Sequence, residues 1–282
     1  MSLDRRSFLK WFSGTMLGTA LTGGTYGFAE TLRQRTRHHT LVTNKWPANF
    51  KPLTIAAVGD LHVGCPAVNL ERTHHIVDQL NAMNADMIVL LGDYLCSSEP
   101  GSTYVPPKPI AEELGRLRAP HGVYAVLGNH DWYNDGKGMW HALEAANITV
   151  LENKSVPVII DGKKIWVAGL ADDITRKPNL THALHNVPHH EPVIVLSHDP
   201  ATFLETTAQP VVTISGHTHG GQVAMPFTGP IMISGRAPLR YAYGHIHENG
   251  NDLIVTSGVG TSALPVRAFA EPEIMHVTVQ SA

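Results

Sequence analysis

Short apolar segments that end in metal- or phosphate-binding residue types recur along this chain. In the first of them, residues 53–58 are almost wholly apolar and lead into Gly59-Asp60-Leu61-His62. Such a run is typical of a buried strand of a parallel sheet. Residues 69–83 then carry apolar side chains near helical spacing, with Asn69 as a candidate N-cap. A strand followed directly by a helix points to an α/β fold.

The same order repeats twice in the first half of the chain. Residues 87–91 are apolar and end in Gly92-Asp93, and residues 122–127 end in Gly128-Asn129-His130-Asp131. Helices are expected near 110–117 and 139–146. Alternation of strands and helices predicts parallel β-α-β units.

Short β segments dominate the second half. We expect strands over 148–151, 156–160, 165–170, 193–196, 211–214, 253–256 and 274–279, the last two completing a second sheet. Asp161-Gly162-Lys163 predicts a hairpin turn between two of them. No linker or internal repeat divides this region. The fold class expected is α/β, a four-layer α-β-β-α sandwich of two mixed β-sheets flanked by helices.

Five of the expected strands end in residues that bind metals. In chain order these residues are Asp60 and His62, Asp93, Asn129 with His130 and Asp131, His198, and finally His217 and His219. Ligands gather beyond the carboxyl ends of strands in α/β sheets, so these side chains are expected to converge. The chain has 18 His but only 2 Cys, which predicts imidazole and oxygen ligands.

The ordered motifs resemble those of the calcineurin-like metallophosphoesterases: Asp-x-His, Gly-Asp, Gly-Asn-His-Asp, His and Gly-His-x-His. The segments 216–222 and 255–267, with Pro272-Glu273-Ile274, are similar to the exported bacterial phosphodiesterase branch. The resemblance implies two metal ions. Their implied ligands are Asp60, His62 and His219 for the first ion, Asn129, His198 and His217 for the second, and Asp93 as the bridge.

The implied chemistry is hydrolysis of a P–O bond. Two divalent ions about 3.5–4 Å apart can stabilise the attacking and leaving oxygens and supply a bridging hydroxide at neutral pH. His130, which is not assigned to a metal, is free to donate a proton to the leaving group. Asp131 either orients His130 or caps the next helix. The mixed nitrogen and oxygen set suits Mn, Fe or Zn.

A phosphodiester, such as one derived from lipid or the cell envelope, is the expected substrate. Tyr94-Leu95-Cys96 follows Gly92-Asp93 in place of an Asp- or Arg-bearing stretch, which favours a diesterase over a phosphoprotein phosphatase. Alternatives are a UDP-2,3-diacylglucosamine-type pyrophosphatase, a lipid head-group phosphodiesterase and a non-enzymatic scaffold. The scaffold is disfavoured because every ligand position is filled. Arg236, Arg240 and Arg267 are candidates to hold the phosphate.

The N-terminus resembles a twin-arginine (Tat) export signal. Arg5-Arg6 precede Phe8-Leu9-Lys10, and residues 11–29 carry no charge. We therefore expect an export signal over 1–29, a linker over 30–52 and the metallophosphoesterase domain over 53–282. The Tat machinery would be a partner, and the location would be the periplasm or the outer face of the cytoplasmic membrane. Cleavage after Ala29 and an uncleaved anchor both remain open.

Charge and cysteine content limit the other partners. The net charge of −3 argues against a broad nucleic-acid-binding surface. Basic residues spread over 30–52 form either a solvated tether or a contact with anionic lipid. Cys65 and Cys96 allow at most one disulfide, and the sequence leaves open whether they pair. The pairs His189-His190 and His245-x-His247 are expected at exposed positions.

Overall fold

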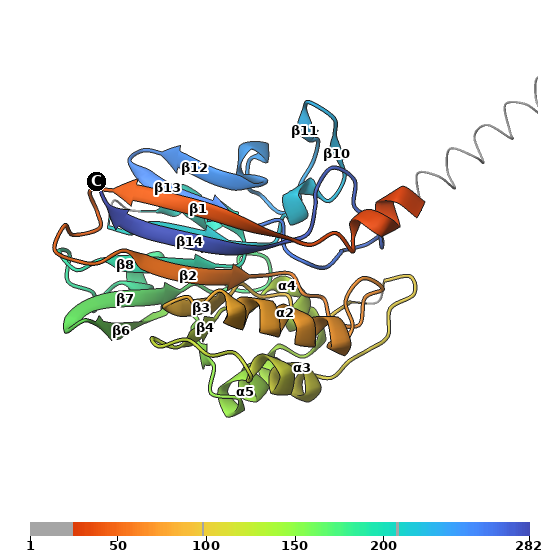
Figure 1. Ribbon diagram of the computed structural model, residues 1–282, viewed down its shortest axis with the longest axis horizontal. Coiled ribbons are helices and arrows are strands. Elements are labelled where there is room, and N and C mark those ends of the chain that lie inside the picture. Colours follow the sequence, from red (N-terminus) through yellow and green to blue (C-terminus); the bar gives the residue numbers. More distant parts are fainter. Residues whose placement is uncertain (1–24, 98, 207–208) are drawn as a thin grey trace, which may run out of the picture.

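Two six-stranded sheets stack face to face in the computed structural model, which describes residues 25–97, 99–206 and 209–282 (Figure 1). The first sheet has the order β1 (Arg35–Thr43), β14 (Glu273–Ser281), β2 (Leu53–Val58), β3 (Met87–Leu90), β4 (Val123–Ala125) and β5 (Thr149–Val150). The second has the order β12 (Gly244–Glu248), β13 (Asn251–Val255), β9 (Val212–Ser215), β8 (Val193–Ser197), β7 (Lys163–Gly169) and β6 (Lys154–Ile160). Both sheets mix parallel and antiparallel neighbours, as expected.

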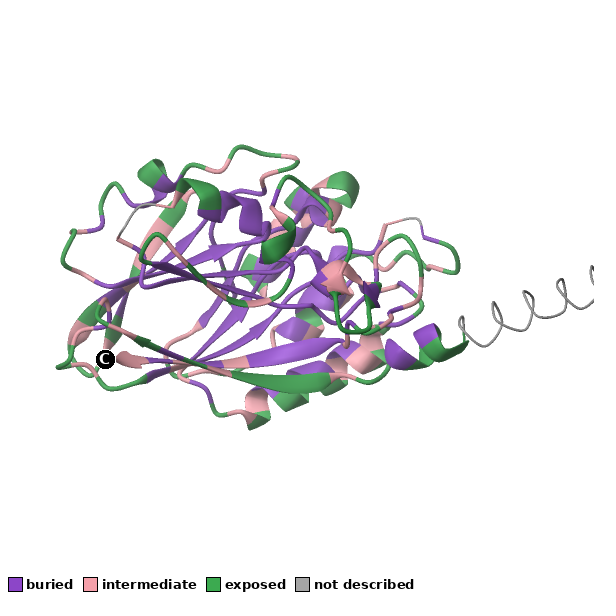
Figure 2. Cartoon of the chain, turned by 90° about the horizontal axis from the view of Figure 1, so that it is seen from above, coloured by how far each residue is buried: buried purple, intermediate pink, exposed green. Residues whose placement is uncertain are grey.

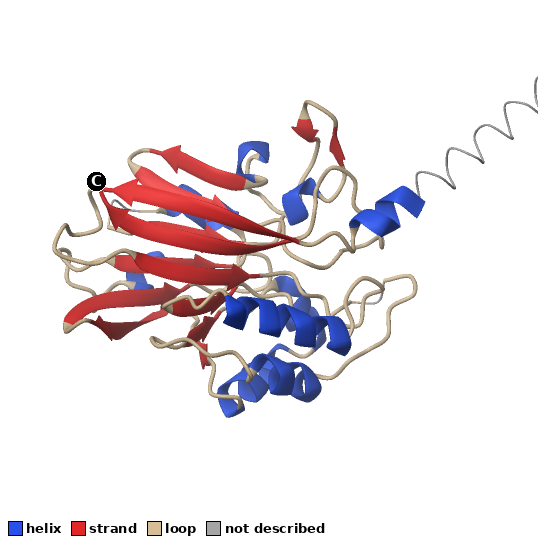
Figure 3. Ribbon diagram, viewed as in Figure 1, coloured by secondary structure: helices blue, strands red, loops and turns tan. Residues whose placement is uncertain are grey.

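Helices cover the outer face of each sheet (Figure 3). The first sheet carries α2 (Leu70–Ala82), α3 (Pro107–Leu114), α4 (Asn129–Asn134) and α5 (Gly136–Ala145). The second carries the shorter α6 (Leu180–Ala183), η1 (Pro200–Glu205) and η3 (Leu239–Tyr241). A turn of helix, η2 (His219–Gly221), and a small hairpin, β10 (Ala224–Met225) and β11 (Gly229–Pro230), complete the elements. The predicted four-layer sandwich is confirmed.

Alternation along the strands divides the interior into layers (Figure 2). In β2, Ile55 and Ala57 pack against side chains of the second sheet, whereas Ala56 and Val58 pack under the helices. A strand whose two faces are both buried must be apolar throughout, which explains the uninterrupted runs in the sequence. Helix α2 begins as predicted, because the side chain of Asn69 accepts a hydrogen bond from the backbone N–H of Arg72.

Two expectations about strand placement were wrong. Residues 273–281, expected in the second sheet, form β14, which pairs antiparallel with β2 in the first. Part of the expected linker over 30–52 is the edge strand β1, paired in parallel with β14 over its whole length. The arginines that suggested a tether pair with acidic residues: Arg35 with Glu271 at 2.7 Å and Arg37 with Glu273 at 3.7 Å. Charged side chains of this kind are common on edge strands.

Residues just before β1 also contact the domain. Residues 25–30 are helical, and the carbonyl oxygen of Gly27 accepts a hydrogen bond from the N–H of Arg267 at 3.0 Å. Glu30 and Thr31 are buried. Most of the expected export signal, residues 1–24, lies outside the described residues. Over the ranges that the structure describes, none of the helices has the length and apolar content needed to cross a membrane.

Candidate metal centre

Loops at the carboxyl ends of five parallel strands bring the seven predicted ligands together. Asp60 and His62 follow β2, Asp93 follows β3, Asn129 follows β4, His198 follows β8, and His217 and His219 follow β9. The first sheet therefore supplies four ligands and the second supplies three. All seven side chains are buried.

The backbone at these positions is unusual. Five of the seven ligands have positive φ, namely Asp60 (54°), His62 (46°), Asp93 (55°), His217 (71°) and His219 (51°). Residues with side chains rarely adopt this region, and each costs about 1–3 kcal/mol unless the surroundings hold it. Strain of this kind clusters at functional sites, so its concentration here is independent support for a site.

One group of donors forms the first half of the centre. The Nε2 atoms of His62 and His219 lie 3.2 Å apart, and His219 Nε2 lies 3.7 Å from Asp60 Oδ1. Asp60 also accepts the N–H of His217, at 3.0 Å to Oδ1, which ties the loop after β2 to the loop after β9. Asp60, His62 and His219 can together hold one metal ion.

A second group forms the other half. His198 Nε2 lies 3.2 Å from Asn129 Oδ1, 3.2 Å from His217 Nδ1 and 3.2 Å from Asp93 Oδ2. Asp93 Oδ2 is also 3.6 Å from His62 Nε2, in the first half. Asp93 therefore stands between the two groups, at the place expected of a bridging ligand.

Ring orientation in the second half leaves nitrogen free for a metal. His198 Nδ1 lies 2.7 Å from the carbonyl oxygen of Leu91, so Nδ1 carries the proton and Nε2 offers its lone pair. His217 Nδ1 faces His198, and its Nε2 lies 3.8 Å from Asp199 Oδ2. His217 Nε2 and Asp199 Oδ2 are both buried without a hydrogen-bond partner among the described residues. Leu91 and Asp199 were not predicted, although Asp199 directly follows a ligand in sequence.

Burial and charge give the ligands different protonation states. Burial lowers the pKa of His62 and of His217 to about 3, which keeps both rings neutral. Burial also raises the pKa of Asp60. Although burial opposes ionisation of Asp93 and His198, their proximity lowers the pKa of Asp93 and raises that of His198. Neutral imidazoles and few carboxylates, with lone pairs aimed at common points, suit divalent ions of the Mn, Fe and Zn type.

Close backbone approach explains one glycine of the motifs. A Cβ atom on Gly128 would lie 2.2 Å from Asp93 Oδ1 and 2.7 Å from His198 Nε2. Any side chain there would displace two ligands, so the Gly-Asn-His-Asp motif needs glycine at its first position.

His130 lies at the edge of the centre and is only partly buried. Its backbone N–H donates to Asp93 Oδ1 at 2.8 Å, and its Nδ1 lies 2.6 Å from Ser97 Oγ. Its ring meets that of His62 edge-on, with 4.6 Å between centroids. Ser97, which sequence reasoning missed, therefore fixes the orientation of the His130 ring. Its proximity to Cys96 offered the only sequence signal.

Asp131 acts through the backbone. Oδ2 accepts the N–H groups of Asp93 and Gly128, both at 2.9 Å, and Oδ1 accepts those of Tyr94 at 2.8 Å and Leu95 at 3.0 Å. Of the two roles expected, the geometry supports capping and not orientation of His130. Asp131 is thus a positioning residue that joins the loop after β3 to the start of α4.

The three candidate phosphate-binding arginines are engaged elsewhere. Arg236 pairs with Asp173 at 2.7 Å and with Glu205 at 2.9 Å, and Arg240 pairs with Glu248. Arg267 is fully buried. Its guanidinium donates to carbonyl oxygens of five residues, Gly260, Ser257, Gly258, Ala270 and His219.

A disulfide joins Cys65 to Cys96 and answers the question that the sequence left open. It links the loop that carries His62 to the loop that carries Ser97.

The pair His245 and His247 has a different partner. Both side chains are hydrogen-bonded to Asp252 Oδ1 at 2.8 Å.

Comparisons with known proteins agree with this geometry. The calcineurin-like phosphoesterase family profile matches residues 53–249. The chain is 32% identical to the uncharacterized metallophosphoesterase YkuE of Bacillus subtilis, over 99% of this chain and 98% of that protein. It is 28% identical to an uncharacterized metallophosphoesterase of Aquifex aeolicus, over 91% of this chain and 96% of that one.

Among solved structures, the NAD nucleotidase of Haemophilus influenzae aligns with a TM-score of 0.49 and 16% identity, covering 74% of this chain and 46% of that chain. The extent of the family match, together with buried histidine and aspartate ligands at the expected strand ends, shows that this chain belongs to the calcineurin-like phosphoesterase family.

Proposed function

We propose that this protein is a phosphodiesterase that works with two divalent metal ions. The observation that carries the proposal is the position of Asp93, whose carboxylate reaches the donors of both halves of the centre. Asp60, His62 and His219 would hold one ion, and Asn129, His198 and His217 the other. When bound, the ions would supply Lewis acidity and a nucleophile at neutral pH.

The remaining residues position the reacting groups. His130 stands beside Asp93 with its ring held by Ser97, and it is more exposed than the ligands. It is therefore suited to donate a proton to the departing alkoxide oxygen. Asp131 holds the backbone on both sides of Asp93 and so keeps that carboxylate in place.

A diester is favoured over a monoester on grounds of charge. A monoester carries a second negative charge and gains from an additional cation near the metals. The segment after Asp93 offers instead the buried side chains of Tyr94 and Leu95 and the disulfide of Cys96. Arg267 is buried next to the ligand His219, but its guanidinium donates to backbone carbonyl oxygens.

A substrate panel tests the proposal. Manganese-loaded enzyme is assayed with bis-p-nitrophenyl phosphate, with p-nitrophenyl phosphate and with a nucleoside diphosphate esterified at its β-phosphate. The metal content is measured on the same sample. We expect about two metal equivalents per chain and the highest kcat/KM on the phosphodiester. Faster turnover of the monoester would contradict the diesterase proposal, and faster turnover of the diphosphate would favour the pyrophosphatase alternative.

The role of His130 has its own signature. In His130→Ala, kcat on a diester with an alkyl leaving group should fall by about 10²–10⁴-fold, because a general acid is lost. A p-nitrophenolate leaving group needs no proton, so its kcat should fall much less. Equal losses on both substrates would contradict the proton-donor role.

We also propose export by the Tat route to the outer side of the cytoplasmic membrane, based on the paired arginines and the uncharged stretch of residues 11–29. Gly27, Glu30 and Thr31 pack against the domain, which favours an exported protein that keeps its signal segment uncleaved. Replacing Arg5 and Arg6 together by Lys should leave the protein in the cytoplasm. Mass spectrometry of the exported protein would show whether its N-terminus precedes residue 27.

A further inference from the structure

An apolar groove of about 380 Å³ adjoins the metal centre on its His219 side. Thr218 and His219 form its inner end, and Val223, Ile231 and Met232 line it further out. The described residues that line it include no Asp, Glu, Lys or Arg. A ligand that extends from the centre in this direction would therefore meet hydrocarbon, with no charged group to pair with.

The outer wall of this groove belongs to the segment that contains the β10–β11 hairpin, which stands out from the body of the molecule (Figure 1). Ile231 is 60% exposed and Met232 70% exposed. Met225 and Phe227 on the same segment are also exposed, Phe227 fully. Contiguous exposed apolar side chains mark binding surfaces for apolar ligands or membranes.

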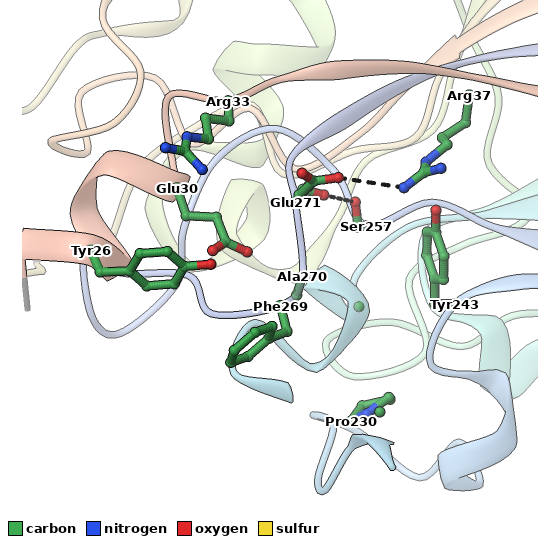
Figure 4. A pocket seen from close by; sticks show the side chains of 12 residues that line it. Tyr26, Glu30, Arg33, Arg37, Pro230, Tyr243, Ser257, Phe269, Ala270 and Glu271 are labelled. Atoms are coloured by element: carbon green, nitrogen blue, oxygen red, sulfur yellow. Dashed lines mark hydrogen bonds and ion pairs between the residues drawn. The ribbon is translucent and has the colours of Figure 1, made fainter. Parts of the chain in front are cut away.

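A second hollow lies on the other side of the η2 turn (Figure 4). Pro230 of β11, Phe269 and Tyr26 from the N-terminal helix line it, together with the charged side chains of Glu30, Arg33, Arg37 and Glu271. The rings of Tyr26 and Phe269 have centroids 6.2 Å apart. The N-terminal part of the described chain therefore meets the domain beside the hairpin. Residues 11–24, which precede it in sequence, carry no charge.

The side of the centre next to His130 has a different character. A hollow of about 500 Å³ there is lined by Ser97, Glu99, Ser102 and Asn134, next to His130. A substrate group that lies next to His130 would thus have polar surroundings.

We propose that the groove between η2 and the β10–β11 segment binds the hydrocarbon chain of a lipid phosphoester whose phosphodiester lies at the metal centre. Three observations support a lipid chain: the groove shares His219 with the ligand set, its lining includes no Asp, Glu, Lys or Arg, and its outer wall is an exposed apolar segment. This inference rests on the proposed phosphodiesterase function and names its substrate class.

Two diesters that differ only in chain length test the proposal. p-Nitrophenyl ethyl phosphate and p-nitrophenyl octyl phosphate have the same leaving group, so their kcat/KM ratio reports binding of the alkyl chain. Burying six additional methylenes even in part predicts a ratio of about tenfold or more in favour of the octyl ester for the manganese-loaded full-length enzyme.

Matched variants locate the chain. Ile231→Ser combined with Met232→Ser should reduce the octyl-to-ethyl ratio by about threefold or more, since the polar side chains offer less apolar contact area. Ile159→Ser serves as the control, because Ile159 is 56% exposed but lies on β6, at the other edge of the second sheet. The control should keep the wild-type ratio.

A binding measurement gives a readout besides turnover. By calorimetry, octylphosphonate should bind the wild-type protein about tenfold or more tightly than ethylphosphonate, and the double variant should lose most of that difference. Equal affinities, or a preference for octylphosphonate that survives in the double variant, would contradict the proposal that the groove binds the alkyl chain.

The outcomes separate this inference from the proposed function. Hydrolysis of both esters at equal rates would leave the phosphodiesterase standing and remove the lipid site. Tighter binding of octylphosphonate without hydrolysis of either ester would keep the groove and contradict the phosphodiesterase.

Discussion

The two halves of the metal centre contain similar ligands but are supported by opposite kinds of group. In the first half, the guanidinium of Arg267 lies 3.3 Å from His219 Nδ1 and donates to the His219 carbonyl. In the second half, oxygen atoms lie behind the rings: the Leu91 carbonyl is hydrogen-bonded to His198 Nδ1, and Asp199 Oδ2 lies 3.8 Å from His217 Nε2, beyond hydrogen-bond distance.

This difference sets the basicity of the ligands. An acceptor behind an imidazole makes the opposite nitrogen a better donor to a metal, whereas a cation behind it makes that nitrogen a poorer one. Burial, His62 and Arg267 together hold the pKa of His219 well below its usual range. We therefore expect the ion in the second half to be bound more tightly than the ion in the first.

Removing the shared ligand should abolish the difference and produce the largest effect. Asp93→Asn takes a charge from both halves, and kcat/KM on a phosphodiester should fall by about 10³-fold or more as several kcal/mol of charge stabilisation is lost. Metal analysis should show that neither half stays full after dialysis. Retention of two equivalents with wild-type turnover would refute the bridging role.

Arg267→Met should lower the stability of the fold around the first half. The carbonyl groups of Gly260, Ser257 and Ala270 lose their donor, and unpaired buried groups cost about 1–3 kcal/mol each. We expect a loss of at least ~3 kcal/mol in the free energy of unfolding by urea. Arg236→Met is the control: its exposed ion pairs should contribute less than about 1 kcal/mol.

Asp199→Asn should act on the second half alone. The amide keeps the volume but replaces an acceptor by a donor on one arm, and such changes behind a ligand cost about 10–100-fold in metal affinity. Stepwise manganese binding followed by electron paramagnetic resonance should show one weakened site. Asp252→Asn, a buried carboxylate on β13, should change neither site. Equal weakening of both sites would contradict the assignment of Asp199.

Proton release on metal binding should be shared between the halves and is the smallest effect. Burial raises the pKa of Asp60. Burial alone would lower the pKa of His198, but the nearby Asp93 carboxylate raises it above its usual value. Each must lose its proton before it binds a metal, so affinity should decrease as the pH falls from 8 to 6. Calorimetry at pH 6 in two buffers should detect about two protons released, roughly one per ion. Release of none would show that the ligands are already deprotonated.

The sequence predicted which side chains converge, because each of them lies next to a local signal. An apolar run followed by Gly-Asp or Gly-Asn-His can be read without knowledge of the rest of the chain. Parallel strands align their carboxyl ends, so Asp93 and His198 were expected to converge although they are 105 positions apart in the sequence. The helix start at Asn69 is another signal of this local kind.

Residues whose role depends on distant partners were predicted poorly. Arg267 was one of three candidates to hold the phosphate, but it donates to carbonyl groups of loops that only the fold brings together. The orienting group Ser97 has no motif of its own. β1 was missed because its arginines resemble those of a solvated tether until Glu271 and Glu273 supply the opposite charge.

The position of β14 has a consequence for the way the chain acquires its structure. β14 lies between β1 and β2, so the first strand of the chain reaches its sheet only through the last one. Arg35 is paired with Glu273, almost the full length of the domain away in sequence. Contacts of such separation form slowly. The first sheet therefore cannot close during synthesis, and a chain that stops short of residue 273 loses two adjacent strands at once.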